Sequence, residues 1–125
     1  MTRKLITAAV LAATLGTQAA AGTLVAINTD IGQVVAAANN GMTLYTFRND
    51  APNQSNCYND CAQAWPPFAA GAAAKPEGAL GIIDRNDGTR QWALNGQPLY
   101  FWAGDSARGD ATGDGVGGVW DVVRN

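Results

Sequence analysis

The chain has 125 residues, with eight basic and ten acidic side chains and 47% hydrophobic residues, so it has room for one domain and hardly a second. It contains no histidine, which excludes a Ser/His/Asp triad, a Cys/His dyad and any His-ligated metal. The formal net charge is −2 and no basic stripe is present, so we expect no nucleic-acid partner. No cofactor-binding motif is recognisable, and we expect no cofactor.

Residues 1–21 have the pattern of an export signal. Arg3 and Lys4 give a positive start, an apolar stretch follows, and small residues precede Gly22. A membrane anchor is the alternative, but the stretch is more polar than the ~20 apolar residues that a span needs. We therefore expect cleavage between Ala21 and Gly22, and a periplasmic or secreted protein.

The mature chain, residues 22–125, keeps all ten acidic residues and six basic ones, a formal charge of −4. Its first cysteine is Cys57, far beyond the signal, so we expect no lipid anchor. These features predict an acidic exported domain with an unknown extracytoplasmic partner or ligand. The oligomeric state is left open.

The mature chain matches itself at an offset of 55 residues. The matching pairs are Ile27/Ile82, Ala38/Ala93, Asn40-Gly41/Asn95-Gly96, Leu44-Tyr45/Leu99-Tyr100, Asp50/Asp105 and Trp65/Trp120. Because the register holds without a gap, we predict two copies of one unit, at about 25–68 and 80–123. The alternative is two unrelated hairpins that share common turn residues.

Each copy carries an Asn-Gly pair, which favours positive φ at both central positions of a tight hairpin turn. Helix signals are poor outside the segment between the two cysteines. The predicted strands are residues 23–27, 34–38, 42–47, 80–85, 90–94, 97–102 and 119–123. We therefore predict a mostly β fold: a single small antiparallel β domain with pseudo-twofold symmetry and one short helix at the Cys-x3-Cys segment.

Six aromatic residues are candidates for the core: Tyr45, Phe47, Tyr100, Trp102, Trp65 and Trp120. The first two lie two positions apart on one strand and share a face, and the next two repeat this arrangement. Large rings supply much of the apolar area that a small core needs. The alternative is an exposed face that stacks on a ligand.

Asp50 and Asp105 each follow a motif tyrosine by five residues. One hypothesis is that each aspartate side chain accepts a backbone hydrogen bond in an Asx turn and so ends its strand. The other uses the symmetry: Asp50 accepts the phenol proton of Tyr100, and Asp105 that of Tyr45, which would lock the two copies together.

Two cysteines, Cys57 and Cys61, are expected to form a disulfide in an exported chain. Four-residue spacing is awkward within an ideal helix, so we expect Cys57 to precede the helix, Ser55 or Asn56 to cap it, and Cys61 to lie in its first turn. A redox-active pair at a helix N-terminus is the alternative.

The glycine-rich run from Asp105 to Gly118 offers Asp105, Asp110 and Asp114 as weak calcium candidates. Calcium loops take six to eight oxygens, commonly with a closing Glu, and that pattern is missing here. A tightly turned glycine loop is the preferred interpretation, and no metal site is assigned.

The motif Gly-x-x-Leu-Tyr-x-(Phe/Trp)-x-x-Asp occurs twice, as GMTLYTFRND and GQPLYFWAGD, accompanied by CYNDCAQAWPPF and GDGVGGVWDVV. Together these segments resemble the bacterial secreted repeat of unknown function, also described as predicted lipoproteins with a Tyr-x-(Phe/Trp/Tyr)-x-x-Asp motif. The resemblance covers nearly the whole mature chain and implies an extracytoplasmic β-rich domain of unassigned activity. The chain departs from that pattern by lacking a lipid-bearing cysteine after the signal and by having Asp114 where the family often has glutamine.

We expect a non-catalytic, exported binding or interaction module. One alternative is an accessory to extracytoplasmic electron transfer that uses the cysteines or the aromatic cluster. Another is an Asp-based hydrolase, which would need two acids about 5–9.5 Å apart in an open cleft.

Overall fold

The computed structural model describes residues 22–124. The expected export signal at residues 1–21 lies outside the described residues, as does its cleavage. Within residues 22–124, no helix is both long and apolar enough to cross a bilayer.

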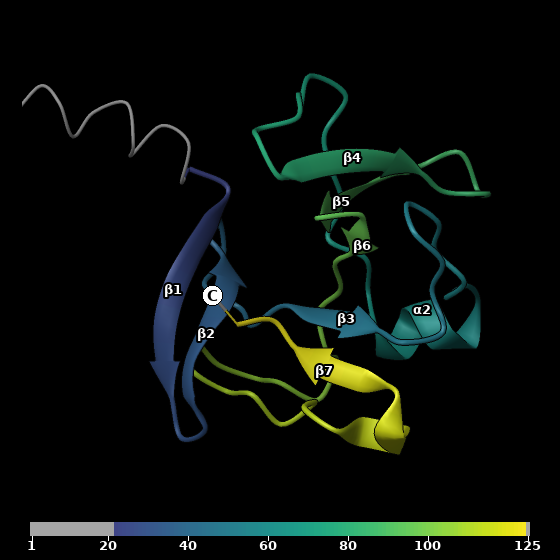
Figure 1. Ribbon diagram of the computed structural model, residues 1–125. Coiled ribbons are helices and arrows are strands. Elements are labelled where there is room, and N and C mark those ends of the chain that lie inside the picture. The colour runs from purple at the N-terminus through teal and green to yellow at the C-terminus, as the bar shows by residue number, and fades with distance from the viewer. Residues whose placement is uncertain (1–21, 125) are drawn as a thin grey trace, which may run out of the picture.

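The described chain is built mainly from short strands (Figure 1). In chain order the elements are β1 (Leu24–Thr29), β2 (Gly32–Ala37), β3 (Tyr45–Phe47), helix α2 (Asp60–Ala64), β4 (Leu80–Asp84), β5 (Arg90–Leu94), β6 (Gln97–Pro98), the 3₁₀ turn η2 (Val116–Gly118) and β7 (Trp120–Val122).

Every strand pair among them is antiparallel, in three small sheets: β1–β2, β3–β7 and β4–β5–β6. Figure 1 shows the β1–β2 hairpin on the left and the three-stranded sheet at the upper right, with β3 and β7 below that sheet and to the right of the hairpin. Because β3 belongs to the first copy and β7 to the second, their pairing joins the two copies. The prediction of a mostly β, antiparallel fold with one short helix is confirmed.

Two clusters of buried side chains form the core, and β2 lies between them. Side chains alternate along a strand, so Val34 and Ala36 enter one cluster while Val35 and Ala37 enter the other. All four are buried, as expected for a strand covered on both faces.

The Leu-Tyr pair of each copy uses the same alternation. Leu44 and Leu99 enter the cluster beside the three-stranded sheet, whereas Tyr45 and Tyr100 enter the cluster beside β7. All four side chains are fully buried. The two adjacent motif residues of each copy therefore anchor their segment of chain between the two core clusters.

The second Asn-Gly turn has the predicted geometry and the first does not. Asn95 and Gly96 both have positive φ, 52° and 83°, and join β5 to β6. In the first copy only Gly41 has positive φ, 72°. The Asn40 side chain instead accepts the N–H of Met42, which makes the connection a longer loop.

The strands after these turns are shorter than predicted. After the first turn, Thr43 forms a single bridge with Ala36 before the chain leaves β2 and pairs with β7. After the second turn, only the two residues of β6 pair with β5, and Tyr100 forms a bridge with Tyr45 instead. Pairing between copies replaces the longer hairpins within each copy.

Helix α2 begins after Asn59, which has φ 56° and makes no side-chain cap. The predicted cap by Ser55 or Asn56 is wrong, since the Ser55 hydroxyl lies in a buried hydrogen-bond network instead. Cys57 precedes the helix and Cys61 lies in its first turn, as predicted. Trp65 ends the helix with φ −126° and ψ 76°, outside the helical region, as expected for a residue that precedes proline. Its ring enters the core.

Candidate functional site

The centre of the molecule is a backbone pair between the two motif tyrosines. Tyr45 N–H donates to the Tyr100 carbonyl at 2.8 Å, and Tyr100 N–H donates to the Tyr45 carbonyl at 2.9 Å. A hydrogen-bonded antiparallel pair of this kind has a local twofold axis through its centre. This axis relates the first copy to the second.

Each tyrosine side chain then crosses to the other copy. The Tyr45 hydroxyl donates to Asp105 Oδ2 at 2.6 Å, and the Tyr100 hydroxyl donates to Asp50 Oδ2 at 2.7 Å. Both bonds of the cross-repeat hypothesis are therefore present. They are of the short kind expected for a hydroxyl on a carboxylate.

The second oxygen of each aspartate closes a loop. Asp50 Oδ1 accepts the N–H of Asn56, six residues on, and Asp105 Oδ1 accepts the N–H and hydroxyl of Thr112, seven residues on. The expected two-residue Asx turns are replaced by these longer closures. The aspartates thus tie a loop of their own copy to the tyrosine of the other.

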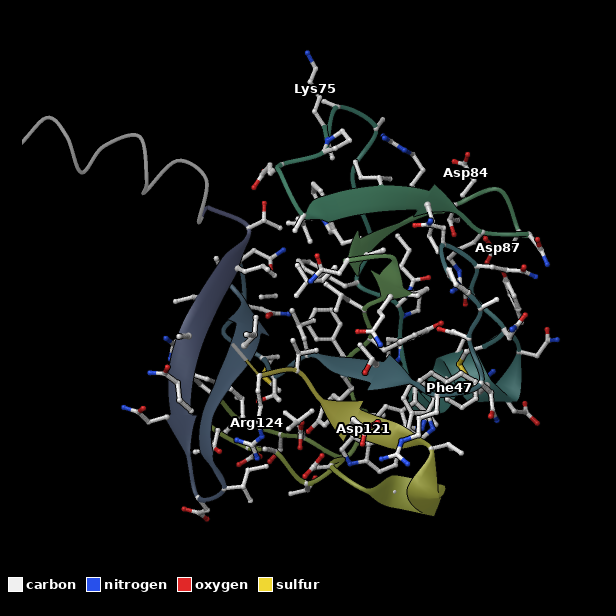
Figure 2. All side chains as sticks on the ribbon, viewed as in Figure 1. Phe47, Lys75, Asp84, Asp87, Asp121 and Arg124 are labelled. Carbon is white, nitrogen blue, oxygen red and sulfur yellow. A yellow bond between two sulfur atoms is a disulfide. The ribbon has the colours of Figure 1, made fainter. Side chains whose placement is uncertain are left out.

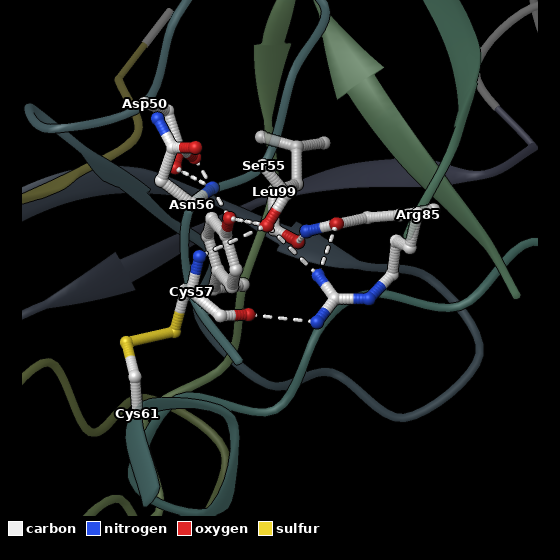
Figure 3. Close-up of a disulfide and its surroundings, with 9 residues drawn as sticks. Asp50, Ser55, Asn56, Cys57, Cys61, Arg85 and Leu99 are labelled. Atoms are coloured by element: carbon white, nitrogen blue, oxygen red, sulfur yellow. Dashed lines mark hydrogen bonds between the residues drawn. A yellow bond between two sulfur atoms is a disulfide. The ribbon is translucent and has the colours of Figure 1, made fainter. Parts of the chain in front are cut away.

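The Tyr100 side differs from the Tyr45 side because it includes a buried cation (Figure 3). The Arg85 guanidinium donates to Ser55 Oγ at 2.9 Å, to Gln91 Oε1 at 2.8 Å and to the Cys57 carbonyl at 2.7 Å. Ser55 Oγ lies 2.6 Å from the Tyr100 hydroxyl. Since that phenol gives its proton to a carboxylate, the serine is the donor, and hydrogen bonds run in one direction from cation to anion.

Sequence reasoning missed Arg85. Its only signal is strand alternation: Ile83 is buried and Asp84 exposed, so the next residue points inward. The guanidinium also lies 4.4 Å over the Tyr58 ring, and its Nε is 3.7 Å from Asp87 Oδ2. Figure 2 shows the exposed side chains around this sheet, Lys75, Asp84 and Asp87, extending outward.

Burial changes the acidity of these groups. It is the main cause of a raised pKa at both Tyr45 and Tyr100, and the hydrogen bond to the facing aspartate raises the pKa further. Burial also raises the pKa of Asp50, an effect that the Asn56 N–H, the Tyr100 hydroxyl and the Arg85 charge oppose. Both phenols therefore stay protonated at neutral pH and act as donors.

Four aromatic rings form a continuous stack across the twofold axis, in the order Phe47, Trp120, Trp65 and Trp102, which we call the ring stack. Successive centroids are 4.2, 3.8 and 4.2 Å apart. The two inner indoles are nearly parallel, at 4°, and come from different copies. The stack therefore bonds the copies through their rings as well as through their backbones.

The two tyrosines contact the stack by their edges. Tyr45 meets Trp65 at 5.3 Å and 78°, and Tyr100 meets Trp120 at 5.1 Å and 88°. These four rings are buried, as predicted for a core. Edge-to-face contact suits the aromatic quadrupole and leaves each phenol oxygen free to reach its aspartate.

The ends of the ring stack are only partly buried, contrary to the prediction that all six rings lie in the core. Phe47 and Trp102 are both half-buried, and Figure 2 shows Phe47 near the carboxyl end of β3. A Cβ on Gly104 would lie 2.4 Å from Trp102 Nε1, so that glycine lies directly on the ring. Since Trp65 packs on the indole as well, the ring is not an open platform for stacking on a ligand.

Two clefts lie beside these ends. The Asp50 cleft, about 180 Å³, is lined by Phe47, Arg48, Asp50, Ala51, Pro52 and residues 95–98. The Asp105 cleft, about 230 Å³, is lined by Asn40, Met42, Thr43, Pro66, Phe101, Trp102 and Asp105.

The two clefts are related by the twofold axis. The positions that they share, at the offset of 55, are Asn40/Asn95, Met42/Gln97, Thr43/Pro98, Phe47/Trp102 and Asp50/Asp105. Each cleft thus combines the ring edge and aspartate of one copy with the Asn-Gly turn of the other. The motif aspartates lie in separate clefts, so the structure does not bring them together as the pair that a glycoside hydrolase needs.

The cysteines form the predicted disulfide, with Cα atoms 5.2 Å apart. Cys57 is fully buried and Cys61 half-buried. The bond closes the segment that supplies the Cys57 carbonyl to Arg85, so it holds one end of the buried network (Figure 3).

The three weak calcium candidates are not gathered into one site. Asp105 serves Tyr45 and Thr112, while Asp110 accepts the N–H groups of residues 106 and 107. Asp114 accepts the N–H of residue 122. Within the described part of the chain, no three acidic or cysteine side chains form a metal-binding group.

Comparison with protein families matches both copies to one model, described as a secreted repeat of unknown function, at residues 25–69 and 81–124. The chain belongs to this family. The family resemblance seen in the sequence is confirmed, and each of the two secreted repeats contributes one Tyr, one Asp and one inner Trp to the arrangement above. Searches of curated proteins and of solved structures gave no match.

Proposed function

We propose that this member of the secreted-repeat family is a non-catalytic binding module that takes its ligand or partner in two equivalent clefts. It would act in the periplasm after removal of residues 1–21 between Ala21 and Gly22. The family is one of secreted repeats, and the composition of residues 1–21 supports the cleavage.

The observation that supports binding is that both equivalent clefts are lined by residues of the family motif. Five equivalent positions line both clefts although the remaining wall residues differ. The positions that the two clefts share include the motif aspartate, the motif aromatic residue and the asparagine of the Asn-Gly turn. Each cleft presents the edge of an aromatic ring and the polar groups of an Asn-Gly turn, which suits small polar ligands or a short chain segment.

The non-catalytic character is supported by the state of the carboxylates. Asp50 and Asp105 each already accept a phenol proton and one or two loop donors. A carboxylate held in this way is a structural acceptor, and neither cleft has a second motif acid to work with it.

The test is a backbone-amide NMR screen with a fragment set of amides, monosaccharides and small ammonium compounds. We expect fragments that shift the amide signals of residues 95–97 also to shift those of residues 40–43. Met42→Trp and Gln97→Trp form a matched pair, since these residues occupy equivalent positions and each substitution fills one cleft. Each variant should lose binding in its own cleft and keep it in the other.

Two results would overturn the proposal. One is a screen in which fragments shift neither turn. The other is fragment binding that persists when both clefts are filled in the double variant, because the binding site would then lie outside the clefts.

A further inference from the structure

The ring stack is chemically polarised although its geometry is nearly symmetric. One end is Phe47 and the equivalent end is Trp102, both half-buried. An indole gives up an electron far more readily than a phenyl ring does. An outer-sphere oxidant can therefore oxidise the stack at the Trp102 end. At the other end Phe47, which is hard to oxidise, covers Trp120.

The ring beside Trp102 leads to a phenol that has a proton acceptor. Trp65 lies 4.2 Å from Trp102 and meets Tyr45 at 5.3 Å, and Tyr45 donates to Asp105 at 2.6 Å. A phenol loses an electron readily only if its proton leaves in the same step. The short bond to a carboxylate provides that transfer without movement of heavy atoms.

Asp105 serves the surface indole as well. Trp102 Nε1 donates to Thr112 Oγ1 at 3.1 Å, and that hydroxyl donates to Asp105 Oδ1 at 2.7 Å. The carboxylate is thus hydrogen-bonded, directly or through one hydroxyl, to both ends of a path that runs from the surface to the buried tyrosine. Phe47 offers no such donor at the equivalent position.

The other tyrosine is disfavoured by charge. Tyr100 accepts from Ser55, which accepts from the buried Arg85 guanidinium. A nearby positive charge opposes the removal of an electron from Tyr100. The Tyr45 hydroxyl accepts instead from the uncharged N–H of Gly113 at 3.1 Å.

We propose that the protein carries out proton-coupled electron transfer, in which an outer-sphere one-electron oxidant takes an electron from Trp102 and the hole passes through Trp65 to Tyr45. The oxidant is reduced by one electron, and both indoles return to their resting state. The Tyr45 O–H bond breaks as the electron leaves, its proton binds Asp105 Oδ2, and the products are a neutral tyrosyl radical and a carboxylic acid. This inference does not depend on the clefts binding a ligand.

The experiment uses photogenerated tris(bipyridyl)ruthenium(III), with methyl viologen as the quencher, and electron paramagnetic resonance of freeze-quenched samples. Ring-deuterated tyrosine identifies tyrosyl radicals by the narrowing of their signal. All variants are made in a Tyr58→Phe background, so that Tyr45 and Tyr100 are the remaining tyrosines. Circular dichroism in the near ultraviolet checks that each variant is folded.

We expect a tyrosyl radical in the background protein, loss of that radical with Tyr45→Phe, and its retention with the matched control Tyr100→Phe. Trp102→Phe should reduce the tyrosyl yield, whereas Trp92→Phe, in the other core cluster, should not. Deuterated solvent should slow formation of the radical, because a proton moves in the step.

Equal loss in the two tyrosine variants would overturn the assignment to Tyr45. A tyrosyl yield that does not depend on Trp102 would overturn the path, and a radical that remains on tryptophan would overturn the coupled proton transfer. If Trp102→Phe does not fold, the comparison of the two tyrosine variants decides the proposal, since Phe keeps each buried ring in place.

Discussion

A methyl group added at Gly113 tests the packing of the ring stack directly. A Cβ there would lie 2.9 Å from Trp102 Cγ, from Trp65 Cη2 and from Tyr45 Cε2. Real Cβ atoms essentially never approach other atoms below 3.0 Å, so all three rings would have to move. Each ring is held by a neighbour, and overpacking of this kind costs about 1–3 kcal/mol.

Because three rigid rings are displaced at once, we expect Gly113→Ala to lower the free energy of unfolding by about 2–3 kcal/mol. Each kcal/mol corresponds to roughly 4–8 °C in Tm for a domain of this size. Equilibrium urea unfolding followed by tryptophan fluorescence measures the loss, with an unchanged m value.

Gly71→Ala is the matched control. A Cβ at Gly71 meets nothing within 4 Å, and this glycine does not have positive φ. We expect stability equal to that of the wild type or slightly higher, since alanine restricts the unfolded chain. The packing argument fails if Gly113→Ala is as stable as Gly71→Ala.

Three further predictions concern charge and crosslinking. Arg85→Met removes three buried charge-assisted hydrogen bonds and should cost at least about 2 kcal/mol in urea unfolding, whereas the exposed Arg48→Met should stay near wild type. Burial raises the folded-state pKa of Asp50, so stability should fall as pH rises from about 4 through that raised pKa, and Asp50→Asn should remove this part of the pH dependence. Reduction of Cys57–Cys61 should cost about 2 kcal/mol, the entropy of a five-residue closure, measured as a shift of the urea midpoint.

The exchange of tyrosine and aspartate between copies could be predicted from the sequence because the repeat implies the symmetry. Once Tyr45 and Tyr100 are equivalent, any contact from Tyr45 to Asp105 requires one from Tyr100 to Asp50, and the structure has both. The disulfide was predictable for a simpler reason, since an exported chain with two nearby cysteines pairs them.

The order of the ring stack could not be predicted. Strand alternation gives the face on which Phe47 or Trp102 lies but does not give its stacking partner in the other copy. The first turn was mispredicted for a local reason: Asn40 uses its side chain to bind the Met42 N–H, and a sequence pattern does not distinguish that from a left-handed backbone.

The buried cation was also beyond sequence reasoning. Arg85 is isolated in the sequence from the groups that it binds, and a strand-end arginine is ordinarily exposed. Its partners, Ser55 and the Cys57 carbonyl, come from a loop of the other copy whose path depends on the whole fold.

The mutual backbone bonds of Tyr45 and Tyr100 have an evolutionary consequence. A single unit on its own would lack the aspartate that accepts from its tyrosine and the second indole that stacks on its inner tryptophan. It could supply both only by forming a symmetric homodimer. Joining two units in one gene removed the requirement that both partners be identical. Tryptophan opposite phenylalanine, and one arginine with no counterpart, are differences that a homodimer cannot have and that the fused chain has acquired.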